Sequence, residues 1–128
     1  MPATVSDASV IGALVFEEPN GARAEQILGD SQLHVPALFA YELANIARTK
    51  ERRGETSRED LLGALRRGFA LDLRWHDVPP LPVFALASDT GLTAYDASYL
   101  YLAMVLSLPI VTFDSAIRAA AVGRVQLL

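Results

Sequence analysis

Short apolar runs alternate along this chain with longer segments whose apolar residues recur at the three- and four-residue spacing of a helix. The short runs have the length of strands, and the longer ones have the length of helices. The pattern predicts strands at residues 3–6, 33–35, 71–78, 109–112 and 124–127. It predicts helices at residues 8–17, 19–29, 37–53, 57–70, 80–88, 93–106 and 115–121. Because helices separate the strands, we expect parallel β-α-β units with helices on both faces of the sheet.

Length and composition limit the chemistry that this chain can carry. A chain of 128 residues with 52% apolar residues is expected to form one domain, residues 1–128, around a substantial core. It contains no cysteine and only two histidines, His34 and His76, which we expect to be structural or surface residues. Thiolate and typical zinc sites are therefore excluded. Any bound metal would be held by oxygen, which favours Mg²⁺ or Mn²⁺.

Charge and hydropathy indicate where in the cell the protein is expected and which partners its surface favours. The apolar runs are far shorter than the roughly 20 residues of a membrane span, and the first residues lack the basic start of a signal peptide. We therefore expect a cytoplasmic protein that does not contact a membrane. The net charge of −4 argues against a general affinity for nucleic acid. The basic run Arg48, Lys50, Arg52 and Arg53 has a solvated helix end as its simplest explanation.

Four acidic residues occupy notable positions in the predicted elements. Asp7 directly follows the first strand and Asp114 comes two residues after the fourth, where ligands bind in parallel α/β sheets. Glu42 lies within the apolar stripe of its helix, and Asp96 shares a helix face with Tyr99. Each acid also has an ordinary explanation. Asp7 and Asp114 suit helix N-caps, Asp96 completes a capping box with Thr93, and Glu42 could escape to water or pair with an arginine.

Taken together, the four acids point to a shared site. The topology is expected to bring them to one end of the sheet, where like charges about 4 Å apart repel by roughly 4 kcal/mol at an effective dielectric of 20. Such a cluster would protonate or separate unless a cation held it. We therefore predict that Asp7, Glu42, Asp96 and Asp114 bind a divalent metal ion.

Several segments resemble a known family. Residues Val5–Val10, Val35–Asn45, Gly91–Leu100 and Pro109–Asp114 resemble, in order and spacing, the motifs of PIN-domain proteins, most closely the VapC-type toxins of toxin–antitoxin pairs. The resemblance covers essentially the whole chain. A local departure is Ser115-Ala116 after Asp114, where many relatives carry a basic or a further acidic residue.

The resemblance implies a three-layer α/β/α sandwich whose central parallel sheet has four to five strands. It implies an Mg²⁺- or Mn²⁺-dependent endoribonuclease, with Asp7, Glu42, Asp96 and Asp114 as both metal ligands and catalytic acids. Ser9 and Thr112 fall where the family places supporting hydroxyls. The implied partners are an RNA substrate, a VapB-type antitoxin and a second copy in a homodimer. In this setting Arg48, Lys50, Arg52 and Arg53 become possible RNA contacts.

Two other classes of protein remain for comparison. A receiver-type phosphoacceptor domain normally needs a lysine after a late strand, and the only lysine here, Lys50, lies on a predicted helix. A catalytically inactive PIN-fold module that engages a protein partner is the more serious alternative, although it would be expected to lose the acids. The tyrosines and Trp75 are predicted to be core or dimer contacts rather than platforms for nucleobases.

Overall fold

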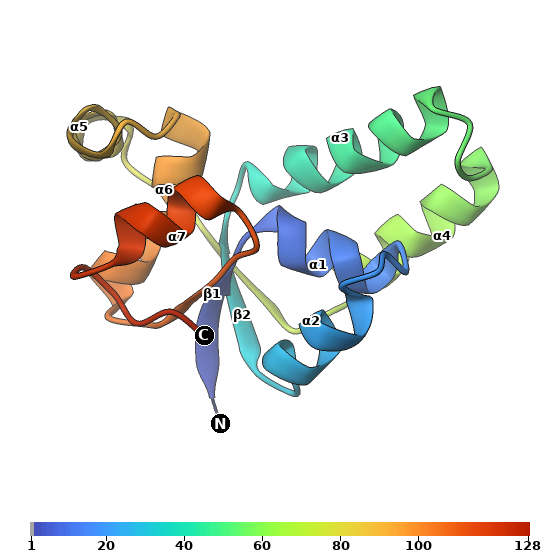
Figure 1. Ribbon diagram of the computed structural model, residues 1–128, viewed down its shortest axis with the longest axis horizontal. Helices are drawn as coiled ribbons and strands as arrows, with labels where there is room; N and C mark the ends of the chain where they lie inside the picture. Colours follow the sequence, from blue (N-terminus) through green and yellow to red (C-terminus); the bar gives the residue numbers. More distant parts are fainter. Residues whose placement is uncertain (1) are drawn as a thin grey trace.

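Four parallel strands form the centre of the molecule, and helices cover both faces of the sheet (Figure 1). The computed structural model describes residues 2–128. The strands are β1 (Ala3–Ser6), β2 (Gln32–Pro36), β3 (Leu73–His76) and β4 (Ile110–Val111). The helices are α1 (Ala8–Val15), α2 (Gly21–Leu28), α3 (Phe39–Arg52), α4 (Arg58–Phe69), α5 (Pro80–Thr90), α6 (Ala94–Leu106) and α7 (Ser115–Ala121). Helices α1–α4 lie on one side of the sheet and α5–α7 on the other, which confirms the predicted three-layer α/β/α architecture.

The order of the strands identifies the functional edge of the sheet. The strands are arranged β3-β2-β1-β4, and every neighbouring pair is parallel. The chain steps outward from β1 to β2 to β3 and then crosses back to place β4 beside β1. The direction of winding therefore reverses between β1 and β4. Open α/β sheets bind ligands outside the carboxyl ends of the strands at such a reversal.

The apolar strands hold this edge in place because they are covered on both faces. Val5, Val35 and Ile110, from three adjacent strands, are fully buried. Ile11 of α1 and Leu100 of α6 belong to the same core cluster and are also fully buried. A parallel sheet packed by helices on both faces needs apolar side chains of this kind in its central strands. The residues that follow β1 and β4 therefore start from a rigid base.

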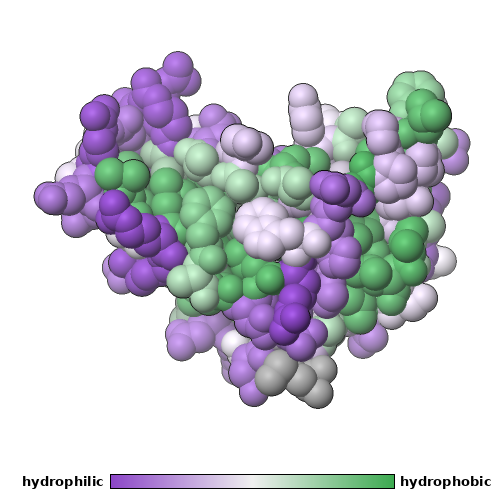
Figure 2. Space-filling view, turned by 180° about the vertical axis from the view of Figure 1, so that it is seen from behind, coloured by the Kyte–Doolittle hydropathy of each residue, from purple (hydrophilic) through white to green (hydrophobic). Residues whose placement is uncertain are grey.

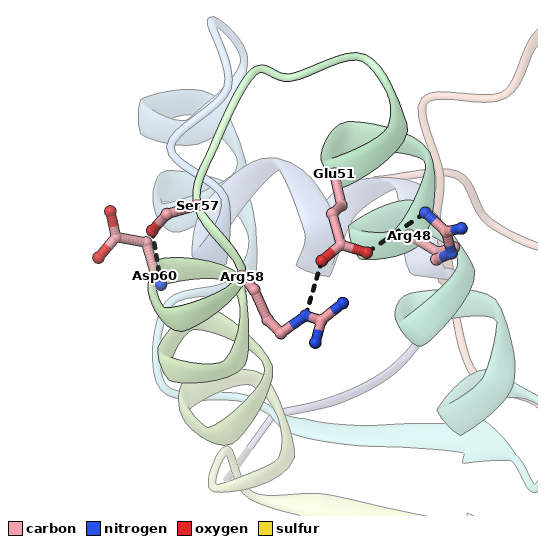
Figure 3. A network of polar contacts seen from close by, with 5 residues as sticks. All are labelled: Arg48, Glu51, Ser57, Arg58 and Asp60. Atoms are coloured by element: carbon pink, nitrogen blue, oxygen red, sulfur yellow. Dashed lines mark hydrogen bonds and ion pairs between the residues drawn. The ribbon is translucent and has the colours of Figure 1, made fainter.

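Helices α3 and α4 form a hairpin that projects from the body of the molecule (Figure 1). Ser57 begins α4 as the predicted cap, since its hydroxyl accepts from the Asp60 amide at 3.2 Å. Glu51 near the end of α3 joins Arg48, at 3.2 Å, to Arg58 of α4, at 2.9 Å (Figure 3). Seen from behind, the molecule shows apolar areas bordered by hydrophilic side chains, including one on the side of this hairpin (Figure 2).

The predicted elements are found with modest changes in their bounds, apart from the last strand. Residues 124–127 do not form a strand of the described sheet, and only an isolated bridge pairs Leu127 with Ile110. The amides of Arg124 and Val125 instead donate to the carbonyl of Ala121, continuing the turn after α7. These amides are thus unavailable to the sheet. Within residues 2–128, no helix combines the length and the apolar character that a membrane crossing requires.

Candidate functional site

A cavity of about 540 Å³ opens where the winding of the sheet reverses. Asp7, Glu42, Asp96 and Asp114 all line it, although they are far apart in the sequence. Its remaining lining residues are apolar, aromatic or neutral polar side chains: Ala8, Ser9, Leu38, Tyr41, Asn45, Ile46, Tyr95 and Tyr99. Thr112 does not line the cavity but lies buried behind it and donates a hydrogen bond to Asp7. The structure thus brings the four predicted acids to one cavity.

Asp7 is the most buried of the four acids, with 4% of its surface exposed. Its Oδ1 accepts from the Ser9 hydroxyl at 2.6 Å and from the amides of Ser9 and Val10, which makes Asp7 the N-cap of α1. Its Oδ2 accepts from the Thr112 hydroxyl at 2.5 Å. Burial raises the pKa of Asp7 above its ordinary value, and the Asp114 charge adds to this, while the hydrogen bonds from Ser9 and Thr112 oppose it.

Glu42 lies in the first turn of α3, at the edge of the apolar stripe rather than at its centre. The stripe buries Phe39, Leu43 and Ala47, whereas Glu42 is only partly buried and faces the cavity. The hydroxyl of buried Tyr99 donates to Glu42 Oε1 at 2.5 Å. Burial raises the pKa of Glu42, and the nearby charges of Asp96 and Asp7 raise it further. Glu42 therefore interacts electrostatically with two of the other three acids.

Asp96 and Asp114 complete the acidic lining from α6 and the start of α7. Thr93 caps α6 by accepting from the Asp96 amide at 3.1 Å, so the predicted capping box uses the Asp96 backbone. Burial raises the pKa of Asp96, and the Asp114 charge contributes. Asp114 caps α7 through Oδ2, which accepts from the Ile117 amide at 2.9 Å.

Thr112 connects the acids that follow the two central strands. Its hydroxyl donates to Asp7 Oδ2 and accepts from the Asp114 amide at 2.9 Å. Ser9 makes a parallel connection, because its hydroxyl donates to Asp7 Oδ1 and accepts from the Phe113 amide at 3.1 Å. Each hydroxyl therefore acts once as donor and once as acceptor between the end of β1 and the segment after β4. This double link fixes the spacing of Asp7 and Asp114.

The donor atoms of the cavity suit a hard divalent cation. The lining offers four carboxylates, the Asn45 amide and the Ser9 hydroxyl, but among the described residues it contains no Lys, Arg or His. Oxygen donors of this kind favour Mg²⁺ or Mn²⁺. Within residues 2–128, no ion pair involves any of the four acids. In the same part of the chain, no three acidic or histidine side chains are grouped closely enough to hold a metal ion as they stand.

The predicted RNA-contacting residues lie away from the cavity. The first turns of α3 line it, whereas Arg48, Lys50, Arg52 and Arg53 lie toward the far end of that helix. From Glu42 to Arg52 the helix rises about 15 Å. Lys50 is paired with Glu18 at 3.1 Å, and Arg48 is engaged by Glu51. The structure therefore does not bring this basic run together with the acids.

Three tyrosines belong to the site although sequence reasoning assigned them no function. Tyr99 is a core residue, as predicted, but its hydroxyl reaches Glu42. Tyr41 and Tyr95 are 80% and 65% exposed and line the cavity, so they are not core residues. A signal was present in the sequence, because Tyr41 directly precedes Glu42 and Tyr95 directly precedes Asp96. His34 and His76 lie outside the cavity lining and contact each other at 2.8 Å.

Comparison with known proteins identifies the family of the chain. Ribonuclease VapC3 from Pyrobaculum aerophilum is 36% identical in an alignment of 115 residues that covers 86% of this chain and 88% of that protein. The crystal structure of PAE2754, also from Pyrobaculum aerophilum, matches with a TM-score of 0.76 at 27% identity, covering 98% of this chain and 84% of that one. The family model described as PIN domain matches residues 4–123, nearly the full length. The chain therefore belongs to the PIN domain family.

Proposed function

We propose that this protein is a divalent-metal-dependent endoribonuclease of the VapC type, the toxin of a type II toxin–antitoxin pair. The observation that carries the proposal is the convergence of Asp7, Glu42, Asp96 and Asp114 on one cavity at the reversal of the sheet. Membership of the PIN domain family and the 36% identity to a protein named ribonuclease VapC3 support it. The reaction is hydrolysis of an RNA phosphodiester bond.

In this proposal the four carboxylates hold Mg²⁺ or Mn²⁺. When bound, such an ion supplies positive charge to the scissile phosphate and Lewis acidity toward water. Asp7 has little freedom to move, because Ser9 and Thr112 bind both of its oxygens. Tyr99 donates to Oε1 of Glu42 and so restricts the rotation of that side chain. These hydrogen bonds pre-position the ligands, which reduces the reorganisation needed when an ion binds.

The test compares RNA cleavage by Asp96→Asn, Glu42→Gln and Asp114→Asn with cleavage by the unaltered protein in Mg²⁺. We expect each variant to lose at least about 100-fold in rate, because misplacing a reacting group by about 1 Å already costs that much. Asp89→Asn is the matched control, since Asp89 is an exposed acid on α5 outside the cavity lining. Chelation should abolish cleavage and added Mg²⁺ should restore it. Full activity of the cavity variants would contradict the proposal.

The expected partners follow from the same assignment. A VapB-type antitoxin would reach the cavity with an arginine, because the cavity presents carboxylates without a lining Lys or Arg among the described residues. A synthetic arginine-bearing tail should inhibit cleavage, and the same peptide with glutamine in place of arginine should not. We also propose a homodimer acting in the cytoplasm. Sedimentation equilibrium of the purified protein tests the dimer.

A second candidate, an inactive PIN-fold binding module, is favoured by one observation. Within residues 2–128, no three acidic or histidine side chains lie close enough together to form a ready-made metal site. Both oxygens of Asp7 already accept hydrogen bonds. Calorimetric titration with Mn²⁺ separates the two candidates. The nuclease requires saturable Mn²⁺ binding that Asp96→Asn weakens, whereas the inactive module requires no such binding.

A further inference from the structure

Two highly exposed tyrosines stand at the acidic cavity. Tyr41 of α3 is 80% exposed and Tyr95 of α6 is 65% exposed, and both line the cavity. Each directly precedes an acid of the site, Glu42 or Asp96, in the first turn of its helix. Folding alone does not explain two large aromatic rings left in water beside a cavity. Exposed aromatic side chains near a site are typical of surfaces that recognise a ligand.

The charge of the cavity limits how it can attract RNA. Four carboxylates line it, and no Lys or Arg is present among its described lining residues. The basic run of α3 begins at Arg48, about 9 Å along the helix from Glu42, and reaches Arg52 at about 15 Å. A polyanion in this cavity therefore meets no cationic side chain in the described lining itself. Uncharged contacts with the bases are what this lining can supply, and aromatic rings provide them by stacking.

Tyr95 also borders a second cavity. This cavity has a volume of about 350 Å³, within the usual range for ligand pockets. Leu38 and Tyr95 line both cavities, so the two adjoin each other. The other walls of the second cavity are largely apolar and include Val78, Pro80 and Val83. A flat, uncharged group that stacks on Tyr95 would thus find an apolar recess next to the acids.

We propose that Tyr41 and Tyr95 are stacking platforms for unpaired nucleobases on either side of the cleaved phosphate, with the second cavity receiving the base that stacks on Tyr95. This proposal rests on the proposed ribonuclease function and names two residues that would contact the bases of its RNA substrate. Paired bases in a duplex have their faces covered by their neighbours and cannot lie on the tyrosines. An unpaired loop or end can present its bases in this way.

The test measures RNA binding apart from cleavage. Asp7→Asn protein in Mg²⁺ is titrated into a fluorescein-labelled single-stranded RNA and into a hairpin with a fully paired stem. In this background Tyr41→Ala and Tyr95→Ala should each weaken single-stranded binding about 5- to 150-fold, which corresponds to the loss of one stacked base. Tyr41→Phe and Tyr95→Phe keep the ring and should bind normally. Phe84→Ala removes an exposed ring of α5 outside both cavities and serves as the matched control.

The outcomes separate this inference from the proposed function. If the unaltered protein cleaves RNA but the alanine variants bind it as the Phe84→Ala control does, the stacking proposal is wrong and the nuclease stands. If the unaltered protein does not cleave RNA, the proposed function itself fails. Binding of hairpin stem and single strand with equal affinity would also overturn the inference. So would dissociation of a dimer by the alanine variants in sedimentation, since the rings would then contact a second copy.

Discussion

Asp7 shows how a helix cap and a ligand position can be the same residue. Its Oδ1 caps α1, and its Oδ2 accepts from Thr112, so the carboxylate is bound at both ends. The sequence offered capping and metal binding as alternatives for Asp7. The structure makes capping a cause of the positioning, because the cap fixes the side chain at the carboxyl end of β1. An acid held in this way lies at the cavity in the metal-free protein as well.

Tyr99 makes a prediction that concerns a single hydroxyl. Its pKa is raised far above the ordinary value by burial and by the neighbouring Glu42 carboxylate, so the phenol stays protonated and donates. Tyr99→Phe removes the 2.5 Å hydrogen bond and leaves Glu42 free to rotate. We expect Mn²⁺ affinity, measured by calorimetry, to fall about 10- to 100-fold, as it does when partners of metal ligands are removed.

Tyr101→Phe is the control for this measurement. Tyr101 lies on the same helix and packs against the smaller core cluster of Val83, Ala87 and Ala97. The Tyr101→Phe substitution removes a hydroxyl from α6 and leaves the hydrogen bond to Glu42 in place, so the Mn²⁺ affinity should stay unchanged. Thermal unfolding of both variants checks that each is folded. Equal Mn²⁺ affinity of Tyr99→Phe and the unaltered protein would show that the Tyr99 hydroxyl does not position Glu42 for metal binding.

The helices explain how four like charges can share one cavity. Asp7 and Asp114 are the N-caps of α1 and α7, and Glu42 and Asp96 lie in the first turns of α3 and α6. Each acid therefore lies at the positive end of a helix dipole, which favours a negative side chain by about 0.3–1 kcal/mol. These contributions offset part of the mutual repulsion. The fold can thus assemble the acids before a cation neutralises them.

The contact between α1 and α2 gives a prediction at the scale of elements. A Cβ at Gly21 would lie 2.9 Å from the carbonyl oxygen of Ala13, a backbone atom that cannot turn aside. Gly21→Ala should therefore lower the free energy of unfolding by about 1–3 kcal/mol, as overpacking does. In α4, a Cβ at Gly63 would meet only Arg67 Nη1 at 3.6 Å. Gly63→Ala should raise stability by up to about 1 kcal/mol through helix propensity.

Urea unfolding of the two alanine variants measures this difference directly. Both substitutions add the same methyl group to a helix, so their difference isolates the close approach of α2 to α1. The two helices must stay together for α1 to hold Asp7 at the end of β1. Equal stability of the two variants would mean that α2 can shift at little cost, and that this packing does not constrain the site.

The periodicity of the chain predicted nearly all of its elements, because each strand is a short run with apolar residues and most helices carry recognisable caps. Ser57 and Thr93 begin α4 and α6 as expected. The segment at 124–127 resembles a strand locally, but the amides of Arg124 and Val125 bond to Ala121, so only the residues after them reach Ile110 of β4, as an isolated bridge. Likewise, the position of Tyr41 directly before Glu42 is a signal in the sequence that does not by itself assign the tyrosine to the site. Whether Tyr41 faces the core or the cavity depends on how α3 rotates against the sheet.

At the scale of the whole molecule, four acidic side chains gather at the cavity, where no ion pair with a basic side chain neutralises them among the described residues. Elsewhere some charged side chains form ion pairs, as Lys50 does with Glu18 and Arg58 with Glu51. At the cavity, burial raises the pKa of Asp7, Glu42 and Asp96 above their ordinary values of 3.8, 4.5 and 3.8. For an acid, a pKa that is higher in the folded state means that folding favours the protonated form. The stability associated with these groups is present below the ordinary carboxyl pKa and is lost as pH rises through the raised values.

Asp96→Asn should therefore stabilise the metal-free protein at neutral pH. The substitution removes a charge repelled by Asp114 and Glu42, and solvent screening limits the gain to on the order of 1 kcal/mol or less. That corresponds to roughly 4 °C or less in melting temperature for a chain of this size. The measurement is thermal unfolding in EDTA from pH 7 down to pH 4. The gain should shrink as pH falls, because protonation then neutralises Asp96 in the unaltered protein as well.

Two comparisons make this pH series decisive for the site as a whole. Asp89→Asn, on the exposed side of α5, should show no stabilisation at neutral pH and no trend with pH. Adding Mg²⁺ at pH 7 should reverse the ranking, because a cation that binds the folded state raises the melting temperature of the unaltered protein more than that of Asp96→Asn. An Asp96→Asn protein that is less stable than the unaltered protein in EDTA would show that the Asp96 carboxylate supports the fold. The position of Asp96 at the cavity would then follow from packing, and repulsion between the acids would not destabilise the metal-free protein.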